Sequence, residues 1–352
     1  MNQKTRIAIN GFGRIGRNLF RLLINHPTIE IVAINDIADN KTMAHLVKYD
    51  SIHGKLPYEC SFSDDAIIVN GKSYLFFHEK LISNLDWKSL AIDFVVEATG
   101  KHKTFDEINA HLLAGAKKVI LTAPSEVDTI KTVVLGVNEA ILNGDEKIIS
   151  NASCTTNNAA PMIKIIDELC GIEQAYITTI HSYTTDQSLH DQPHKDLRRA
   201  RGASQSIVPT TTGAAKALTK IFPKFEGKIG GCGIRVPVPD GSLTDITCYV
   251  KKEVTIAEIN AVASVGDVLK TVQEDYPEHV KVREEGVALL PTGEPSIDKL
   301  LGGGWRNGIY GIAGRPKQGK SMVMLHFARK LAEQGKSVLF VSYEMEKHQV
   351  YD

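Results

Sequence analysis

The sequence has no excess of charge of either sign, and it has no long hydrophobic run. Lysine plus arginine and aspartate plus glutamate number 41 each, so net charge predicts neither a nucleic-acid nor a membrane partner. No apolar stretch approaches the roughly eighteen residues that a membrane-spanning helix needs, and the apolar run before Asn10 is too short for a signal peptide. We therefore expect a soluble, cytoplasmic protein.

Cysteine is also sparse. The chain has 5 cysteines among 352 residues, an odd number without a C-x-x-C pair. That spacing carries no zinc signature and is typical of a reducing compartment. What is present is ordinary globular composition, with 43% hydrophobic and 23% charged residues in a chain long enough for two or three domains.

A glycine-rich turn near the N-terminus follows a short apolar strand at residues 7–9 and precedes apolar residues at helical spacing. Here Gly11 allows a tight turn, Gly13 lets a pyrophosphate approach the backbone, and Gly16 lets helix and strand pack closely. The spacing alone is a weak signal, but the strand–turn–helix context predicts a dinucleotide site. The expected cofactor contacts in this turn are Gly11, Gly13, Arg14, Ile15 and Gly16.

An acidic residue follows the second predicted strand, which covers residues 30–34. Asp36 lies twenty residues beyond Gly16, where an acid accepts hydrogen bonds from the adenosine ribose hydroxyls. Because such an acid would repel a 2′-phosphate, the pattern favours NAD over NADP. The alternative is a solvated loop aspartate without a ligand.

Strands and helices alternate through the first half of the chain, which predicts a mostly parallel, doubly wound α/β sheet. Ligands in such sheets bind at the carboxyl ends of the strands, so the turns after two strands, carrying Thr99, Gly100 and Thr122, are expected to face the cofactor. Further strands are predicted at residues 66–69, 74–77, 94–97, 118–122 and 133–137, and helices at 41–48 and 105–114.

The stretch S-N-A-S-C-T-T-N at residues 150–157 sets one cysteine among small and hydroxyl residues. A helix is predicted over residues 156–169, so Cys154 is expected at its first turn. Unpaired backbone N–H groups and the helix dipole favour the thiolate there. A buried, inert cysteine is the alternative.

His181 follows a strand predicted over residues 175–180 and is the candidate base. An aldehyde attacked by a thiolate forms a tetrahedral hemithioacetal, which loses a hydride only as a base removes the hydroxyl proton. An imidazole near Cys154 would stabilise the thiolate and move that proton. A histidine that is merely hydrogen-bonded is the alternative.

Six motifs stand in one order along the first part of the chain. They are N-G-F-G-R-I-G-R at 10–17, S-N-A-S-C-T-T-N at 150–157, H-S-Y-T-T-D-Q at 181–187, L-R-R-A-R-G-A at 197–203, T-T-T-G-A-A-K at 210–216 and R-V-P at 235–237. With them, residues 1 to about 261 resemble phosphorylating glyceraldehyde-3-phosphate dehydrogenase. The resemblance implies a Rossmann-type NAD-binding domain at 1–153, a truncated α+β catalytic domain at 154–261, a homotetramer, and oxidative phosphorylation of glyceraldehyde 3-phosphate to 1,3-bisphosphoglycerate in glycolysis.

The resemblance also implies two anion sites near the sulfur, one for the substrate's phosphate and one for the attacking phosphate. Arginine suits them because its guanidinium binds phosphate oxygens in pairs, and an acid among them, Asp186, is expected to orient an arginine. Arg198 and Arg201 have a weaker claim, with surface or subunit contacts as the alternative. No metal is expected in this part. The implied residues are Ser153, Thr155, Thr184, Asp186, Arg199, Thr212, Gly213 and Arg235.

After about residue 261 the sequence departs from the dehydrogenase pattern. The family's aromatic-rich turn and long closing helix have no counterpart downstream, which predicts impaired catalysis. Residues 262–286 are expected to form a helical connector, because apolar residues recur at helical spacing until Pro277.

A phosphate-binding motif, G-x-x-x-x-G-K-S, then spans residues 314–321 between a predicted strand and a predicted helix. Backbone N–H groups of such a loop cradle phosphates, its lysine neutralises them, and its serine ligates Mg²⁺. The motif predicts ATP and magnesium binding, with a glycine-rich surface loop as the alternative. The residues concerned are Gly314, Gly319, Lys320 and Ser321.

Residues 287–352 resemble the start of the RecA-type core of replicative hexameric helicases, a partial P-loop α/β unit. The carrying motifs are L-P-T-G-E-P-S-I-D-K-L-L at 290–301 and V-S-Y-E-M at 341–345. The resemblance implies that Glu344 polarises the attacking water. No DNA-contacting loop follows in this sequence, so we expect no nucleic-acid partner.

Two partial enzymes of unrelated classes suggest a dehydrogenase coding region joined out of place to a helicase-like one. The dehydrogenase is the leading function because its nucleophile, base, cofactor site and anion sites are all present. A nucleotide-binding P-loop module with a passenger dehydrogenase part is the second hypothesis, and a cofactor-binding protein without turnover is the third.

Overall fold

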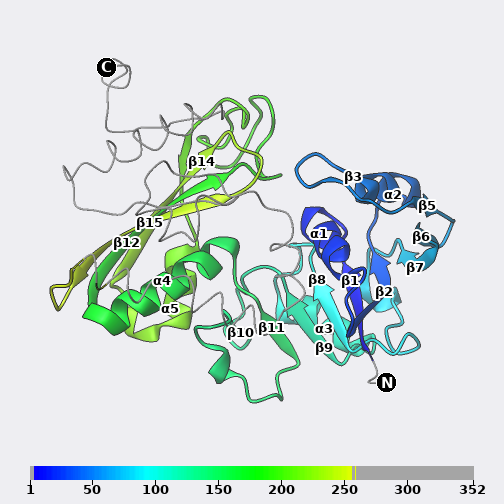
Figure 1. Ribbon diagram of the computed structural model, residues 1–352, viewed down its shortest axis with the longest axis horizontal. Helices are drawn as coiled ribbons and strands as arrows, with labels where there is room; N and C mark the ends of the chain where they lie inside the picture. Colours follow the sequence, from blue (N-terminus) through cyan, green and yellow to red (C-terminus); the bar gives the residue numbers. More distant parts are fainter. Residues whose placement is uncertain (1–3, 256–257, 259–352) are drawn as a thin grey trace, which may run out of the picture. The chain divides into compact units, whose positions relative to one another are not determined.

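The computed structural model describes residues 4–255 and 258, and the described chain up to Glu253 belongs to one compact unit (Figure 1). A nine-stranded sheet and a four-stranded sheet organise this unit. The connector at 262–286 and the phosphate-loop residues Gly314, Gly319, Lys320, Ser321 and Glu344 lie outside the described residues.

The nine-stranded sheet has the order β10-β11-β9-β8-β1-β2-β7-β6-β5. Neighbouring strands are parallel from β10 to β7 and antiparallel at β6 and β5, which confirms the mostly parallel, doubly wound sheet. The bounds are β1 Thr5–Asn10, β2 Ile29–Asn35, β5 Cys60–Phe62, β6 Ala66–Val69, β7 Lys72–Phe77, β8 Phe94–Glu97, β9 Lys118–Leu121, β10 Lys131–Thr132 and β11 Ile148–Ser150.

Three helices, α1 (Arg14–Leu23), α2 (Asn40–Lys48) and α3 (Phe105–Leu113), accompany this sheet. Phe20 of α1 packs in one apolar cluster with inward residues of β1, β2 and β7, and a separate cluster forms around the buried Trp87. Both faces are therefore covered, which explains why these strands are nearly continuous apolar runs in the sequence.

The strand predicted over residues 133–137 is wrong. β10 ends at Thr132, and a turn follows in which the Asn138 side chain accepts from Val134 N at 2.8 Å and donates to Thr132 O at 2.9 Å. Val134 is buried in an apolar cluster with α4 and α5 residues. Its apolar character reflects packing rather than strand pairing.

The four-stranded sheet has the order β13-β14-β12-β15. Helices α4 and α5 pack on one of its faces, while alternate residues of β15 are exposed on the other. The bounds are α4 Cys154–Cys170, β12 Ile172–Ser182, β13 Val208–Thr210, α5 Ala214–Ile221, β14 Ile229–Val236 and β15 Ser242–Val250, with β3 Tyr49–Asp50, β4 Gly54–Lys55, η1 Ile82–Asn84, η2 Glu139–Ile141 and η3 Pro223–Phe225 elsewhere.

The described residues contain neither a candidate membrane span nor a candidate metal site. No helix among them is long and apolar enough to cross a membrane. Within residues 4–255 and 258, no group of three or more histidine, cysteine, aspartate or glutamate side chains is placed to hold a metal ion.

Candidate active site

Helix α4 begins at Cys154, two residues earlier than predicted. The chain enters it through Ala152, a non-glycine residue with φ +58°, a conformation that costs about 1–3 kcal/mol and is common at functional sites. Ser153 caps the helix, because its hydroxyl accepts from Thr156 N at 3.1 Å. Cys154 is thus exposed at the N-terminal end of a seventeen-residue helix.

Cys154 and His181 are brought together, with 3.1 Å between Sγ and Nε2. This contact lowers the pKa of the thiol despite its partial desolvation, and hydrogen bonds from Thr155 at the helix N-terminus lower it further. The same contact raises the pKa of His181, against burial of the ring. A thiolate–imidazolium pair is therefore favoured, as the sequence predicts.

The second ring nitrogen of His181 has two neighbours. Nδ1 lies 2.8 Å from Ser182 O and 2.6 Å from Arg235 Nη1. A guanidinium only donates, so Nδ1 accepts from Arg235 only in the neutral tautomer that carries its proton on Nε2. When Nδ1 carries a proton, as in the protonated ring and in the neutral tautomer with a free Nε2, it donates to Ser182 O. The charge of Arg235 opposes the rise in the pKa of His181, which keeps the neutral, basic form accessible.

Strand pairing explains why these side chains meet. His181 of β12 and Arg235 of β14 are register partners in parallel strands, and Val208 of β13 pairs with Arg235 from the other side. A continuous piece of sheet therefore places residues about fifty positions apart beside Cys154. No local sequence pattern contains this information.

Asp186 holds an arginine, as predicted. Its Oδ2 accepts from Arg199 Nη1 at 2.6 Å, and Arg199 Nε donates to Thr210 Oγ1 at 2.8 Å. Burial opposes ionisation of Asp186, but the hydrogen bonds from Arg199 and His194 keep its pKa below the ordinary value. His194, whose Nε2 lies 3.3 Å from Asp186 Oδ1, is a member of this group that the sequence did not indicate.

Positive charge gathers near the sulfur. Burial and the charge of Arg199 both lower the pKa of Arg235, while Cys154 raises it. Two guanidiniums that repel each other are typical of a site built for anions. Thr212 and Gly213 stand at the N-terminus of α5, where Thr212 Oγ1 accepts from Ala214 N at 3.2 Å. Thr184 follows β12 and is half-buried.

Arg198 and Arg201 make different contacts. Arg198 pairs with Asp196 at 2.9 Å, and Arg201 pairs with Asp191 at 2.9 Å. Both arginine side chains are more than half exposed. This placement agrees with the surface alternative.

The glycine-rich turn is as tight as its spacing indicates. Gly11 has φ +94°, and a Cβ there would lie 2.5 Å from Thr99 N. A Cβ on Gly16 would lie 2.1 Å from Gly11 O, whereas one on Gly13 would meet no atom within 4 Å. Gly11 and Gly16 are therefore required by packing, and Gly13 borders open space at the N-terminus of α1.

Asp36 stands beside this turn. Its Oδ2 accepts from Phe12 N at 2.6 Å, and its Oδ1 accepts from Ala38 N at 3.1 Å. Each carboxylate oxygen has a second lone pair, so Asp36 retains acceptor capacity for a ribose hydroxyl. Such an acid beside a glycine turn at a helix N-terminus fits an NAD adenosine and pyrophosphate.

Arg14 and Ile15, two of the predicted cofactor contacts in this turn, have different surroundings. Arg14 donates from Nη1 to Pro239 O at 3.0 Å and pairs through Nη2 with Asp240 at 2.7 Å. The turn is thereby tied to the loop between β14 and β15. Ile15 is 53% exposed.

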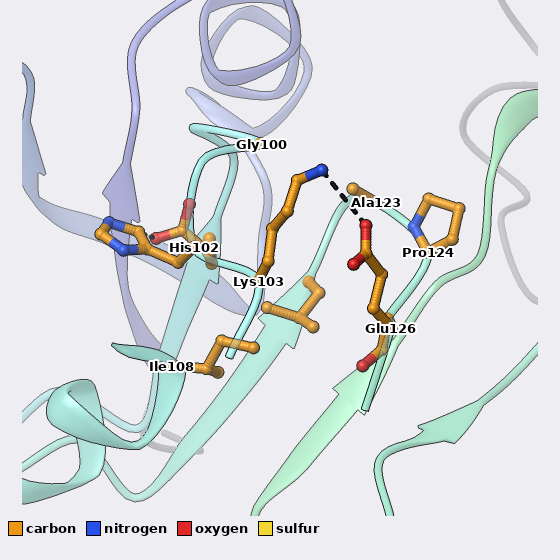
Figure 2. A pocket seen from close by; sticks show the side chains of 10 residues that line it. Gly100, His102, Lys103, Ile108, Ala123, Pro124 and Glu126 are labelled. Atoms are coloured by element: carbon orange, nitrogen blue, oxygen red, sulfur yellow. Dashed lines mark hydrogen bonds and ion pairs between the residues drawn. The ribbon is translucent and has the colours of Figure 1, made fainter. Parts of the chain in front are cut away.

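The turns after β8 and β9 are neighbours, as Figure 2 shows. Lys103 and Glu126 form an ion pair of 3.2 Å between them. Thr122 donates from N and Oγ1 to Glu97 O at 3.1 and 3.2 Å. Thr99, Gly100 and Thr122 thus meet at one edge of the sheet, as parallel strands require.

Sequence reasoning missed a buried polar group behind this edge. Glu97 accepts hydrogen bonds from Thr99 and Asn10 and contacts His111, which accepts from Trp87. The available signal was a glutamate ending an apolar strand, since such a residue needs several partners when buried.

A Rossmann-type sheet with a glycine turn and an acid after its second strand is typical of NAD-dependent oxidoreductases. Two family models match the chain: "Glyceraldehyde 3-phosphate dehydrogenase, NAD binding domain" at residues 5–105 and "Glyceraldehyde 3-phosphate dehydrogenase, C-terminal domain" at residues 153–273. The chain belongs to the glyceraldehyde-3-phosphate dehydrogenase family, which confirms the resemblance.

Similar relatives are named as that enzyme. The one from Geobacillus stearothermophilus is 49% identical over 73% of this chain and 76% of its own length. A second from Bacillus subtilis is 50% identical over 73% and 76%, and one from Thermotoga maritima is 46% identical over 88% and 96%. Residues 289–352 match the model "DnaB-like helicase C terminal domain", which confirms the second resemblance.

Proposed function

We propose that this protein catalyses the NAD-dependent oxidative phosphorylation of glyceraldehyde 3-phosphate to 1,3-bisphosphoglycerate. The observation that carries the proposal is the 3.1 Å contact of Cys154 Sγ with His181 Nε2, at a helix N-terminus and with Arg235 Nη1 2.6 Å from His181 Nδ1. The names of the relatives support the same substrate.

In the proposed first step, the Cys154 thiolate attacks the aldehyde carbon and forms a hemithioacetal. His181 Nε2 gives its proton to the carbonyl oxygen and takes it back as the hydride leaves. Bound NAD supplies the hydride acceptor. The carbon is oxidised by two electrons and becomes a thioester on Cys154.

In the proposed second step, inorganic phosphate attacks the thioester carbon. The C–S bond breaks, and Cys154 leaves as a thiolate stabilised by His181 and by the N–H of Thr155. Arg199 and Arg235 hold the two phosphate groups near the sulfur. The remaining residues proposed for these groups are Ser153, Thr184, Thr212 and Gly213.

The proposed cofactor site is the glycine turn with Asp36 and the edge formed by Thr99, Gly100 and Thr122. Open space at Gly13 accommodates the pyrophosphate, and backbone N–H groups of Arg14 and Ile15 lie in the first turn of α1. Asp36 favours NAD over NADP.

We also propose the domain division 1–153, 154–261, 262–286 and 287–352. The family matches begin at residues 5, 153 and 289, close to three of these boundaries, whereas the second match runs to residue 273, inside the proposed connector. A homotetramer, implied by the family resemblance, and a cytoplasmic location are part of the same proposal. Turnover is expected to be lower than that of the Geobacillus and Bacillus enzymes, since the alignments cover about three quarters of each of them.

The test uses the purified full chain with NAD, phosphate and glyceraldehyde 3-phosphate. NADH formation that requires phosphate, and that Cys154→Ser abolishes, is the expected result. NAD binding without any turnover contradicts the proposal and supports a cofactor-binding protein. Turnover equal to that of the Geobacillus stearothermophilus enzyme contradicts the expected impairment.

A second candidate is a nucleotide-binding P-loop module, which the match at residues 289–352 favours. Lys320 and Ser321, with magnesium, would hold ATP phosphates, and Gly314, Gly319 and Glu344 complete that proposed site. ATP binding that Lys320→Ala removes, in a chain without NADH formation, supports this candidate over the dehydrogenase.

A further inference from the structure

Glu97 ends β8 two residues before Thr99, and its side chain is 3% exposed. Its Oε1 accepts from Thr99 N at 2.8 Å and from the Thr99 hydroxyl. Its Oε2 accepts from Asn10 Nδ2 at 2.5 Å and lies 3.1 Å from His111 Nε2. One buried carboxylate thus joins the turn after β8 to the end of β1.

The proton position on His111 follows from its other neighbour. Trp87 Nε1 lies 3.1 Å from His111 Nδ1, and an indole nitrogen only donates. Nδ1 is therefore the acceptor, so the neutral ring carries its proton on Nε2 and donates to Glu97. Both rings are fully buried, so water does not supply an alternative partner.

The amide orientation of Asn10 is fixed in the same way. Asn35 accepts from Glu79 N at 2.9 Å and donates to Glu79 O at 3.0 Å, which sets its own amide. Asn35 Nδ2 also donates to Asn10 Oδ1 at 2.8 Å. Asn10 consequently presents its NH₂ group to Glu97, and the chain of side chains crosses the ends of β2, β1 and β8.

Each hydrogen-bond partner of Glu97 is therefore a donor, and only an ionised carboxylate accepts from all of them. His102 Nε2 lies farther away, 4.0 Å from Glu97 Oε2. Burial opposes ionisation, but the hydrogen bonds from His111, Thr99 and Asn10 prevail and keep the pKa of Glu97 below its ordinary value. Replacing Glu97 by glutamine would turn the new NH₂ group toward one pair of these donors. Either the Thr99 pair or the Asn10–His111 pair would lose its acceptor.

We propose that Glu97 is a positioning residue for the dinucleotide, holding the Thr99–Gly100 turn against the glycine turn in the arrangement that the cofactor binds. This inference rests on the proposed NAD-dependent function. The two turns are closely packed, since a Cβ on Gly11 would lie 2.5 Å from Thr99 N. A shift of Thr99 therefore moves the surface offered to the cofactor.

The experiment compares the full chain with its Glu97→Gln variant by NAD titration calorimetry and steady-state kinetics. We expect the NAD dissociation constant and the KM for NAD to rise about tenfold or more, because the turn loses hydrogen bonds to a charged acceptor. The kcat at saturating NAD and the KM for glyceraldehyde 3-phosphate should stay within about twofold. The control is Glu126→Gln, which breaks the exposed Lys103–Glu126 pair on the adjacent turn and should leave NAD affinity unchanged.

A merely structural role gives a different outcome. If Glu97 only stabilises the fold, Glu97→Gln should have a lower unfolding midpoint, but the folded variant should bind NAD as the wild type does. That result overturns the inference. Wild-type protein that fails to bind NAD overturns the proposed function and the inference together. Wild-type binding with unchanged Glu97→Gln affinity overturns the inference alone.

Thr99→Val supplies a second, milder variant, since it removes the hydroxyl donor and keeps the shape. It should weaken NAD binding severalfold, and in the Glu97→Gln background it should add little, because both changes release the same turn. Fully additive effects overturn the inference. Where Glu97→Gln does not fold, unchanged NAD affinity of Thr99→Val overturns it.

Discussion

Two carboxylates, Glu97 and Asp186, each hold neighbouring polar side chains in place, but in different surroundings. Glu97 belongs to the nine-stranded sheet, here called the cofactor sheet, and Asp186 follows β12 of the four-stranded sheet, here called the catalytic sheet. The Glu97 side chain is 3% exposed and accepts from Asn10 and the Thr99 turn, whereas the Asp186 side chain is 46% exposed and holds Arg199. Hydrogen bonds lower the pKa of both against desolvation.

The difference concerns what each site must do. A cofactor surface is preformed when its backbone turns are fixed by buried hydrogen bonds. An anion site needs charges that remain accessible, so that an arginine exchanges part of its contact with a carboxylate for phosphate. We therefore expect substitutions in the two sheets to separate NAD binding from chemistry.

The largest separation of NAD binding from turnover is expected for Cys154→Ser. Turnover should fall by about 10⁴-fold or more, since the thiol that forms the thioester is lost. NAD affinity should stay near that of the wild type. Coupled assays of NADH formation and NAD titration measure both. Cys60→Ser, in β5, is the matched control with normal turnover, and equal loss in the two variants would contradict the assignment.

His181→Asn should lower kcat by about 10²–10⁴-fold. It should also slow alkylation of Cys154 near neutral pH: the contact lowers the pKa of the thiol, so without it the thiolate forms only at higher pH. The pH profile of iodoacetamide labelling measures this shift. A profile that does not move toward higher pH would show that His181 does not stabilise the thiolate.

Gly16→Ala should damage the cofactor sheet alone. Its Cβ would lie 2.1 Å from Gly11 O, and we expect a loss of about 1–3 kcal/mol in the free energy of unfolding, as for overpacked sites, with weaker NAD binding. Gly13→Ala is the matched control, since its Cβ meets open space: stability should be unchanged although NAD binds less well. Urea unfolding tests both, and similar midpoints for the two variants would refute the packing account.

The smallest effect is expected from Asp186→Asn. Loss of its charge loosens Arg199, so the KM for glyceraldehyde 3-phosphate should rise about three- to tenfold. The change is modest because the Asp186 side chain is 46% exposed and Arg199 keeps its hydrogen bond to Thr210. NAD affinity should not change. Asp196→Asn, which breaks the Arg198 pair, is the control, and a matching rise in its KM would assign the effect to surface charge instead.

Local patterns sufficed for much of the cofactor sheet. β6 and β8 have the predicted bounds, and α2 starts one residue before the predicted helix, because apolar periodicity and glycine spacing act over short distances. The start of α4 was misplaced, since it depends on the Ser153 cap and the positive φ of Ala152. The strand predicted at 133–137 was wrong because the Asn138 side chain hydrogen-bonds Val134 N and Thr132 O and so stabilises a turn there.

The sequence by itself determined the family, and it predicted the candidate nucleophile, the candidate base, the glycine turn and the acid at position 36. Those features lie in short motifs, and their chemistry depends on residue type and spacing. Only the tertiary structure decided that Arg235 lies against His181, that His194 supports Asp186, and that Glu97 joins Asn10, Thr99 and His111. These contacts arise from strand register and burial, which bring together residues far apart in the chain.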